Sequence, residues 1–482
     1  MAGAASLFST STGLCADSVE SVPGCSGLFA LATYQVDKHE QDQAQSSSSS
    51  STRPARTDDN DENNDHSDDG DDTDGSTSAS PAYTRRGTCS LYYASSATNE
   101  GKVECDKVDV IETPAILDMK WSLTQAGSGV RRMLGVANAK GHITLHRLQG
   151  DGSSSRLHSI GELQFNDRNA LCLSLDFSDR TGGHAGGYNM SNLATDTSMI
   201  VSQSDGSLAY LPSVEAALST VSVDEVTSDL AQTSIHKPAS SNDDASESDD
   251  DWDRSSADER DATLLAAHAA LNADRPNKPR GLTTWSAHDF EAWIAAFDCF
   301  TPTTVWSGGD DLTLKGWDMR SPVAPSTVPH PTFACTKPFD GGVTSLQSHH
   351  LHQHIWAVGS YDGKLRLWDA RMPTRALSET VVGGGVWRVK WHPVDPSVLL
   401  VGCMHDGFKV LRLDELGEDG AGGAALRGKE FEVVTRFDGH ESLAYGCDWQ
   451  RDSDDGVDGQ GRKVYSCSFY DSSLHIWDSQ TP

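Results

Sequence analysis

The sequence lacks the segments that carry a protein into or across a membrane. No run of about 18 consecutive apolar residues occurs in the chain, so a membrane-spanning helix is not expected. The N-terminus has no charged segment followed by a long apolar core, as a secretion signal would have. We therefore expect a soluble, cytoplasmic protein with no membrane partner.

The motifs of common metal, nucleotide and hydrolase sites are also absent. The 10 cysteines form no CxxC pair, and several fall where a buried strand is expected, which favours free thiols over zinc sites or disulfides. The chain contains no GxSxG turn, no HExxH motif and no GxxxxGK[ST] phosphate loop. We expect no bound metal ion and no cofactor.

Basic residues are few for the number of acidic ones. Lys and Arg number 38 against 70 Asp and Glu, which gives a formal net charge of −32. Such a chain attracts neither nucleic acid nor anionic lipid, so no nucleic-acid partner is expected. Three polar segments, 39–82, 239–262 and the Gly-rich 414–428, lack the apolar spacing of a folded element. They are predicted to be disordered or solvated loops, and an acidic docking segment would have the same composition.

A recurring strand ending is the strongest pattern that the sequence contains. Three segments share an Asp in a tight turn, an alternating strand and a final Trp-Asp, namely 311–318 (DLTLKGWD), 362–369 (DGKLRLWD) and 471–478 (DSSLHIWD). Weaker copies occupy 141–148, 205–211 and 406–413. Each copy follows a short apolar strand, and the spacing predicts four strands in each repeat of about 40–45 residues. The pattern indicates an all-β fold: residues 1–482 form a single seven-bladed WD40 β-propeller in which each repeat Trp packs between neighbouring blades.

The N-terminal residues are needed to complete this ring. Six copies lie between residues 114 and 478, so the seventh blade must come from the N-terminal part of the chain. Leu28–Tyr34 and Thr88–Tyr93 are predicted to be two of its strands. Residues near Leu7–Thr10 are predicted to complete the last blade beside Leu474–Trp477 and so to close the ring.

Two sets of loops meet on one face of such a propeller and define a candidate site. The residues before the tight turns are Ala139, Ser204, Asp310, Tyr361, His405 and Tyr470. One residue after the first apolar position of the innermost strands stand Leu117, Leu173, Trp293, Thr344, Trp387 and Tyr445, and the loops that lead into these strands add His288, Glu291, His440 and Ser442. Large or ionisable residues therefore gather in blades four to seven, which predicts a binding site there. His288 and His440 also match the structural His of the repeat, and the aromatic residues also match plain packing; both alternatives stay open.

The His-rich segment 349–354 is a weak metal-site candidate. It lies in a short connection between strands and has no nearby carboxylate or Cys partner in the sequence. We expect a polar loop.

Several segments go beyond what propeller packing requires. They include 287–297 (AHDFEAWIAAF), 383–393 (GGGVWRVKWHP), 402–408 (GCMHDGF), 440–449 (HESLAYGCDW) and 466–477 (SCSFYDSSLHIW). Through these segments, through 306–320 and 359–371, and through Ala16–Glu20 and Ala30–Tyr34, the chain resembles the diphthine methylesterase family of WD-repeat proteins. The resemblance is good over 281–478, thinner over 14–36 and 85–211, and absent in the acidic insertions.

This resemblance implies a hydrolase of diphthamide synthesis. Such proteins remove the methyl ester from methylated diphthine, a modified His of translation elongation factor 2, before the final amidation. His405 or His288 is then the expected general base for water, with Tyr361, Tyr470 and Ser442 positioning the ester; a Ser442 nucleophile with His440 is the alternative. Trp293, Trp387 and Tyr445 are expected to form an aromatic cage for the trimethylammonium group, with Glu291, Asp310 and His440 as further substrate-binding residues.

The main rival prediction is a non-catalytic scaffold, which is the commonest role of WD propellers. Substrate receptors of cullin ubiquitin ligases carry Trp-Asp-x-Arg endings, and this chain has two, which end in Arg320 and Arg371. These residues would contact a cullin-ligase adaptor, although each Arg could instead cap its own strand. We expect a monomer in either case.

Overall fold

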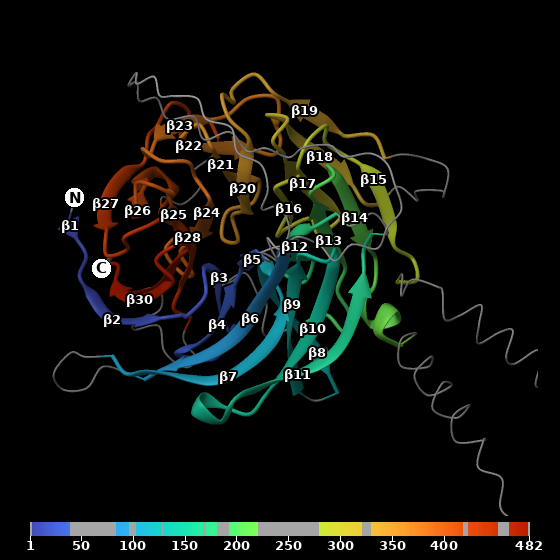
Figure 1. Cartoon of the computed structure of the whole chain (residues 1–482). Helices are drawn as coiled ribbons and strands as arrows, with labels where there is room; N and C mark the ends of the chain where they lie inside the picture. The colour runs from blue at the N-terminus through green and yellow to red at the C-terminus, as the bar shows by residue number, and fades with distance from the viewer. Residues whose placement is uncertain are drawn as a thin grey trace, which may run out of the picture.

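Short antiparallel sheets recur along the chain and surround a common axis (Figure 1). The computed structural model describes residues 2–38, 83–95, 103–127, 129–166, 170–180, 192–219, 279–320, 329–417, 423–451 and 462–480. Within these residues the strands form seven sheets, which we call blades 1 to 7 in chain order. The first strands of neighbouring blades contact one another all the way around, from β3 of blade 1 to β28 of blade 7 and back to β3. The predicted seven-bladed β-propeller is therefore confirmed.

The first four blades follow the chain from the N-terminal side, with the strand nearest the axis first. Blade 1 contains β3 (Ala16–Ser21), β4 (Leu28–Thr33), β5 (Gln35–Lys38), β6 (Tyr83–Ala94) and β7 (Cys105–Pro114). Blade 2 contains β8 (Ile116–Ala126), β9 (Gly129–Asn138), β10 (His142–Gln149) and β11 (Arg156–Gln164). Blade 3 contains β12 (Cys172–Phe177), β13 (Met199–Gln203), β14 (Ser207–Leu211) and β15 (Thr283–Ser286). Blade 4 contains β16 (Ile294–Phe297), β17 (Thr304–Gly308), β18 (Leu314–Asp318) and β19 (Phe333–Cys335).

The last three blades complete the ring. Blade 5 contains β20 (Val343–Ser348), β21 (Ile355–Ser360), β22 (Lys364–Asp369) and β23 (Ser378–Val381). Blade 6 contains β24 (Arg388–Trp391), β25 (Val398–Gly402), β26 (Phe408–Arg412) and β27 (Glu432–Phe437), with β1 (Ala2–Gly3) parallel to β27. Blade 7 contains β28 (Ala444–Trp449), β29 (Lys463–Ser468), β30 (Ser473–Asp478) and β2 (Ser6–Ser11).

The N-terminal strand closes the ring as predicted. β2 pairs antiparallel with β30, with Phe8 opposite Ile476 and Thr10 opposite Leu474. The outer strand of blade 7 therefore comes from the opposite end of the chain from its other three strands, and the two termini lie close together (Figure 1). This pairing gives the C-terminal edge strand a partner that it would otherwise lack.

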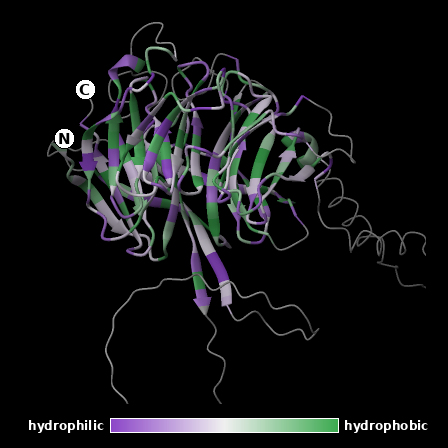
Figure 2. Ribbon diagram, turned by 90° about the horizontal axis from the view of Figure 1, so that it is seen from above, coloured by the Kyte–Doolittle hydropathy of each residue, from purple (hydrophilic) through white to green (hydrophobic). Residues whose placement is uncertain are grey.

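The hydrophobic core is divided among the contacts between blades. Each of the seven clusters of buried residues in the described part of the chain joins two neighbouring blades, including blades 7 and 1. Trp317 packs edge-on against Trp285 of blade 3, with ring centroids 5.5 Å apart, and Trp477 stacks on Phe437 of blade 6 at 4.9 Å. The repeat Trp residues therefore pack between blades, as predicted. Figure 2 shows the disc from its edge, with hydrophobic residues along the strands.

The predicted loops fall mostly outside the described residues. This holds for segments 39–82 and 239–262, the first of which joins β5 to β6. The described ends of segment 414–428 differ from a solvated loop, because Leu416 and Leu426 are fully buried against blades 5 and 6. These two leucines anchor the described ends of the segment to the core.

The His-rich connection of blade 5 is more than a polar loop. His349 and His350 are buried, and their Nε2 atoms lie 3.0 Å from the carbonyl oxygens of Pro396 and Pro393 in blade 6. Burial lowers the pKa of His350 to about 3 and lowers that of His349 below its ordinary value. Both imidazoles are therefore neutral in the folded protein and connect two blades.

His350→Gln should make stability less sensitive to acid. The folded-state pKa of His350 lies below the unfolded value, so its contribution is complete at neutral pH and is lost as pH falls from about 6.5 towards 3. Between pH 7 and pH 5, protonation of His350 in the unfolded state should lower the free energy of unfolding of the wild type by about 2 kcal/mol. The variant has no imidazole at this position and should not show this loss. Urea denaturation at the two pH values measures the difference, with the exposed His158→Gln as control. Equal losses in the wild type and in His350→Gln would contradict the assignment.

Candidate functional site

Each innermost strand starts with an irregular residue at the mouth of the central channel. Register shifts place bulges at Asp17, Leu117, Leu173, Thr344 and Tyr445. A bulge re-aims one side chain relative to the regular alternation of the strand. Trp293 and Trp387 directly precede the first residues of β16 and β24 and occupy the same position in blades 4 and 6. We call these seven residues the collar.

The collar residues of blades 4, 6 and 7 form one aromatic cluster. The ring of Trp387 lies 5.7 Å from that of Trp293 and 5.0 Å from that of Tyr445. Tyr361, from the tight turn of blade 5, contacts Trp293 at 6.1 Å and Trp387 at 5.8 Å. Blades 4 and 6 are not neighbours, so the contact between their Trp rings shows that both side chains turn inward, over the small Thr344 of blade 5. The structure thus brings four predicted site residues together.

The cluster continues towards blade 1 through Phe469 and Tyr34, which were not predicted as site residues. The ring of Phe469 lies 5.1 Å from that of Tyr445 and 5.0 Å from that of Tyr470. Tyr34, which directly follows β4, contacts Phe469 at 6.1 Å. Tyr470 is 71% exposed and forms the outer end of the row. The segment SFYD could have pointed to Phe469, because that residue directly precedes Tyr470.

The aromatic residues predicted to form a cage lie in one contiguous cluster. Trp387 is in contact with three other rings, so it is the central ring of the cluster. Trp293, Trp387 and Tyr445 are all half-buried, so part of each side chain remains available to a ligand. The indole Nε1 of Trp387 is buried and has no hydrogen-bond partner among the described residues, which is uncommon for a buried donor.

Two carboxylates lie beside the blade 4 end of the cluster. The indole of Trp293 donates a hydrogen bond to Asp310 at 3.1 Å, and the backbone carbonyl of Glu291 accepts one from the Asp310 amide at 2.9 Å. Burial raises the pKa of Tyr361, and the charges of Asp310 and Glu291 raise it further. Tyr361 is therefore a neutral hydrogen-bonding group at neutral pH. These predicted substrate-binding residues are placed beside the aromatic rings.

His288 is held inside blade 4, which argues against its predicted role as a general base. Its Nδ1 lies 2.9 Å from Asp311 and its Nε2 lies 2.8 Å from the hydroxyl of Ser307, which also accepts a hydrogen bond from Trp317 at 2.9 Å. The residue is only 3% exposed. Because both ring nitrogens are occupied, His288 has the structural role that the repeat provides.

His440 has the same arrangement in blade 7. Its Nδ1 contacts Ser473 at 2.7 Å, and its Nε2 contacts Ser466 at 2.9 Å, where Trp477 also donates. Neither nitrogen is available to activate Ser442. The arrangement removes the predicted pairing of a Ser442 nucleophile with His440.

His405 and Ser442 line a small pocket between blades 6 and 7. The pocket has a volume of about 150 Å³ and is lined by His405, Gly407, Phe437, Asp438, His440, Glu441 and Ser442. Met404 has a φ of 40° and pairs with Ala444 in an isolated bridge, so His405 and Tyr445 flank the same contact. His405 is exposed. The pocket and the aromatic cluster therefore adjoin on one face.

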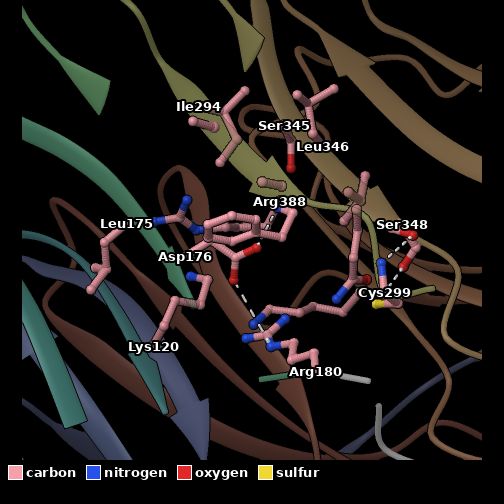
Figure 3. A pocket seen from close by; sticks show the side chains of 16 residues that line it. Lys120, Leu175, Asp176, Arg180, Ile294, Cys299, Ser345, Leu346, Ser348 and Arg388 are labelled. Carbon is pink, nitrogen blue, oxygen red and sulfur yellow. Dashed lines mark hydrogen bonds and ion pairs between the residues drawn. The ribbon is translucent and has the colours of Figure 1, made fainter. Parts of the chain in front are cut away.

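Charged residues occupy the channel beneath the collar. Glu20 on β3 accepts hydrogen bonds from Lys120 of blade 2 at 3.0 Å and from Lys390 of blade 6 at 2.6 Å. Although burial opposes it, these two ammonium groups lower the pKa of Glu20. A cavity of about 40 Å³ lies nearby, and Figure 3 shows Lys120, Asp176, Arg180 and Arg388 around it. Glu20 and Lys390 lie in two of the segments that carry the family resemblance, but no spacing in the sequence indicates that they meet in the channel.

The two Arg residues of the Trp-Asp-x-Arg endings bind their own strands. Arg320 donates to Asp318 and Arg371 donates to Asp369, both with a shortest distance of 2.7 Å. Both Arg side chains are more than half exposed. The geometry matches the capping alternative and leaves both Arg side chains open to solvent.

Among the described residues, no group of three or more His, Cys, Asp or Glu residues is arranged to hold a metal ion. No helix among them is long and apolar enough to cross a membrane.

Comparisons with known proteins give several relatives that share one name. The sequence matches no family model. A Homo sapiens protein named diphthine methyltransferase is 32% identical over 453 residues, which is 93% of this chain and 75% of the human protein. The Mus musculus protein of that name is 33% identical over 70% of this chain and 54% of its own length. A Dictyostelium discoideum homologue is 38% identical over 40% of this chain and 51% of its own length.

A solved structure, "Crystal Structure of Mitotic Checkpoint Complex", is similar with 13% identity and a TM-score of 0.45, covering 81% of this chain and 83% of the other. The propeller itself is established by its seven paired sheets.

Proposed function

The chain belongs to the diphthine methyltransferase family, and from this premise we propose that it hydrolyses a methyl ester during diphthamide formation. The proposed substrate is methylated diphthine on translation elongation factor 2. Hydrolysis leaves the carboxylate that the final amidation step requires and releases methanol.

The aromatic cluster is the observation that carries this proposal. Diphthine bears a trimethylammonium group, which cannot donate a hydrogen bond and is best recognised by the faces of aromatic rings. Trp293, Trp387 and Tyr445 occupy equivalent positions in three blades and keep part of their surface free, and Trp387 contacts both of the others. Propeller packing does not require aromatic residues at this position, since Leu117 and Thr344 occupy it in blades 2 and 5.

The adjoining pocket supplies groups for the chemical step. In the proposed reaction, His405 accepts a proton from water as the water oxygen bonds to the ester carbonyl carbon. The tetrahedral intermediate then expels methoxide, which takes that proton and leaves as methanol. Tyr361, Tyr470 and Ser442 are proposed to orient the ester and its developing oxyanion through their hydroxyl groups.

Intact-protein mass spectrometry of elongation factor 2 bearing methylated diphthine tests this proposal. The wild type should remove about one methylene in mass, and His405→Ala should reduce kcat by about 100-fold with little change in KM. A chelator-treated sample shows whether a metal ion takes part. His288→Asn should lower the thermal stability, because His288 bonds both Asp311 and Ser307 inside blade 4.

Two other outcomes would replace the proposal. A gain of mass that depends on an added methyl donor would make the protein a methyltransferase, as its relatives are named. No mass change with folded protein, together with co-purification of a cullin adaptor that is lost on Arg320→Ala with Arg371→Ala, would make it a scaffold.

A further inference from the structure

Asp17 is the collar residue of blade 1 and lies next to the aromatic cluster. It occupies the bulge between Ala16 and Ser18 of β3, as Tyr445 occupies the bulge of β28 in the neighbouring blade. A Cβ atom added at Gly446 would lie 2.9 Å from the backbone oxygen of Asp17, so the two bulges pack directly on each other. Asp17 is 6% exposed.

One carboxylate oxygen of Asp17 lacks a hydrogen bond. Among the described residues, its buried Oδ2 has no donor. The guanidinium of Arg388 is 3.9 Å from this atom, but it lies closer to Asp118, at 3.4 Å, and it donates to the Leu117 carbonyl at 3.3 Å. A buried carboxylate without a close donor is costly, and a ligand that brings a positive charge would offset that cost.

The charge of Asp17 affects the pKa values of two nearby tyrosines. Burial raises the pKa of Tyr445, and the carboxylate of Asp17 raises it further. Burial also raises the pKa of Tyr34, where Arg85 opposes the shift and Asp17 adds to it. The carboxylate and the aromatic rings therefore belong to one electrostatic environment.

We propose that the collar binds a quaternary methylammonium group, with Asp17 as its counter-charge and Trp387 and Tyr445 as its aromatic faces. Such a cation donates no hydrogen bond, so it suits a carboxylate oxygen that has no donor. Its methyl groups suit Leu117 and Leu173, which occupy the collar positions beyond Asp17. The inference rests on the proposed function for the identity of the substrate, and it adds the residue that selects for positive charge.

The site should bind cations more tightly as pH rises. Burial raises the pKa of Asp17 to about 7, with Arg388 and Lys120 opposing the shift and Asp118 adding to it. Below this pH Asp17 is neutral and attracts a cation less strongly. The other titratable groups that respond to its charge are Tyr34, Tyr445 and Cys467.

Isothermal titration with choline and its uncharged isostere 3,3-dimethylbutan-1-ol tests the inference on the full chain. The wild type should bind choline at least about fivefold more tightly than the isostere at pH 8, and this preference should shrink at pH 6. Asp17→Asn should lose the preference and its pH dependence while keeping its affinity for the isostere. Asp340→Asn removes one charge from an 82% exposed carboxylate and is the matched control.

Each outcome bears on one claim. Equal choline affinity in the wild type and in Asp17→Asn, or equal affinity of the wild type for choline and the isostere at pH 8, would overturn the inference. The wild-type pH titration decides the matter even if Asp17→Asn does not fold. Choline binding that depends on Asp17, without hydrolysis of the modified elongation factor, would support this inference and overturn the proposed function. Hydrolysis with full activity in Asp17→Asn would support the proposed function and overturn this inference.

Discussion

Deleting residues 1–11 should open the propeller and lower its free energy of unfolding by on the order of 5 kcal/mol. The deletion removes β2, five of whose residues pair with β30, and each backbone hydrogen bond of such a ladder contributes about 0.5–1.5 kcal/mol net. It also removes Leu7 and Phe8, which pack against the core between blades 7 and 1. Urea denaturation followed by tryptophan fluorescence measures the change against the full chain.

A shorter deletion distinguishes the loss of ring closure from the effect of shortening the N-terminus. Removing residues 1–3 takes away only β1, which pairs with β27 through Ala2 and Gly3, so the loss of stability should be small. The longer deletion should also self-associate on a sizing column, because β30 becomes an unpaired edge strand. An unchanged urea midpoint after deletion of residues 1–11 would show that β2 does not hold the ring closed.

Ring closure could be predicted from sequence because the repeat fixes both the number and the phase of the strands. Each copy ends with a strand whose apolar residues alternate. Counting the strands in all copies therefore shows that the last blade lacks an outer strand. The burial of His349, His350, Leu416 and Leu426 could not be predicted in the same way. They contact a neighbouring blade through loops, and no periodic pattern governs loop positions.

The candidate site was predictable where the repeat gives equivalent positions. Trp293, Trp387 and Tyr445 occupy one position of the repeat, and the contacts of Trp387 with the other two follow from the propeller's geometry. Asp17 was missed because blade 1 has no Trp-Asp ending to set the phase, although its segment Ala16–Glu20 matches the starts of the other innermost strands.

The roles of the histidines were harder to predict from the repeat than the positions of the aromatic residues. His288 and His405 are both ionisable residues of the same face, but a blade buries the first and leaves the second exposed. The partners that decide this, Asp311 and Ser307, are 23 and 19 residues away from His288 in the chain. The repeat suggests that such a His is structural, yet only the contacts settle its role.

Trp387→Ala should lower kcat/KM for the methylated diphthine substrate by about 30-fold. Trp387 is the central ring of the cluster, in contact with Trp293, Tyr361 and Tyr445, so its removal takes away one aromatic face and loosens the others. Loss of about 2 kcal/mol of cation–π attraction corresponds to this factor. Steady-state kinetics with the modified elongation factor measures it.

The loss should fall on KM and leave kcat nearly unchanged. The trimethylammonium group keeps its charge throughout ester hydrolysis, so the ring binds the substrate and the transition state equally, which is the case in which only KM rises. His405→Ala should show the opposite division, because its proton transfer belongs to the chemical step. Trp387→Phe keeps a ring and should stay within about fivefold of the wild type. If Trp387→Ala had wild-type KM and wild-type affinity for choline, the aromatic cluster would be a packing feature of the propeller, and the cation would have to bind elsewhere.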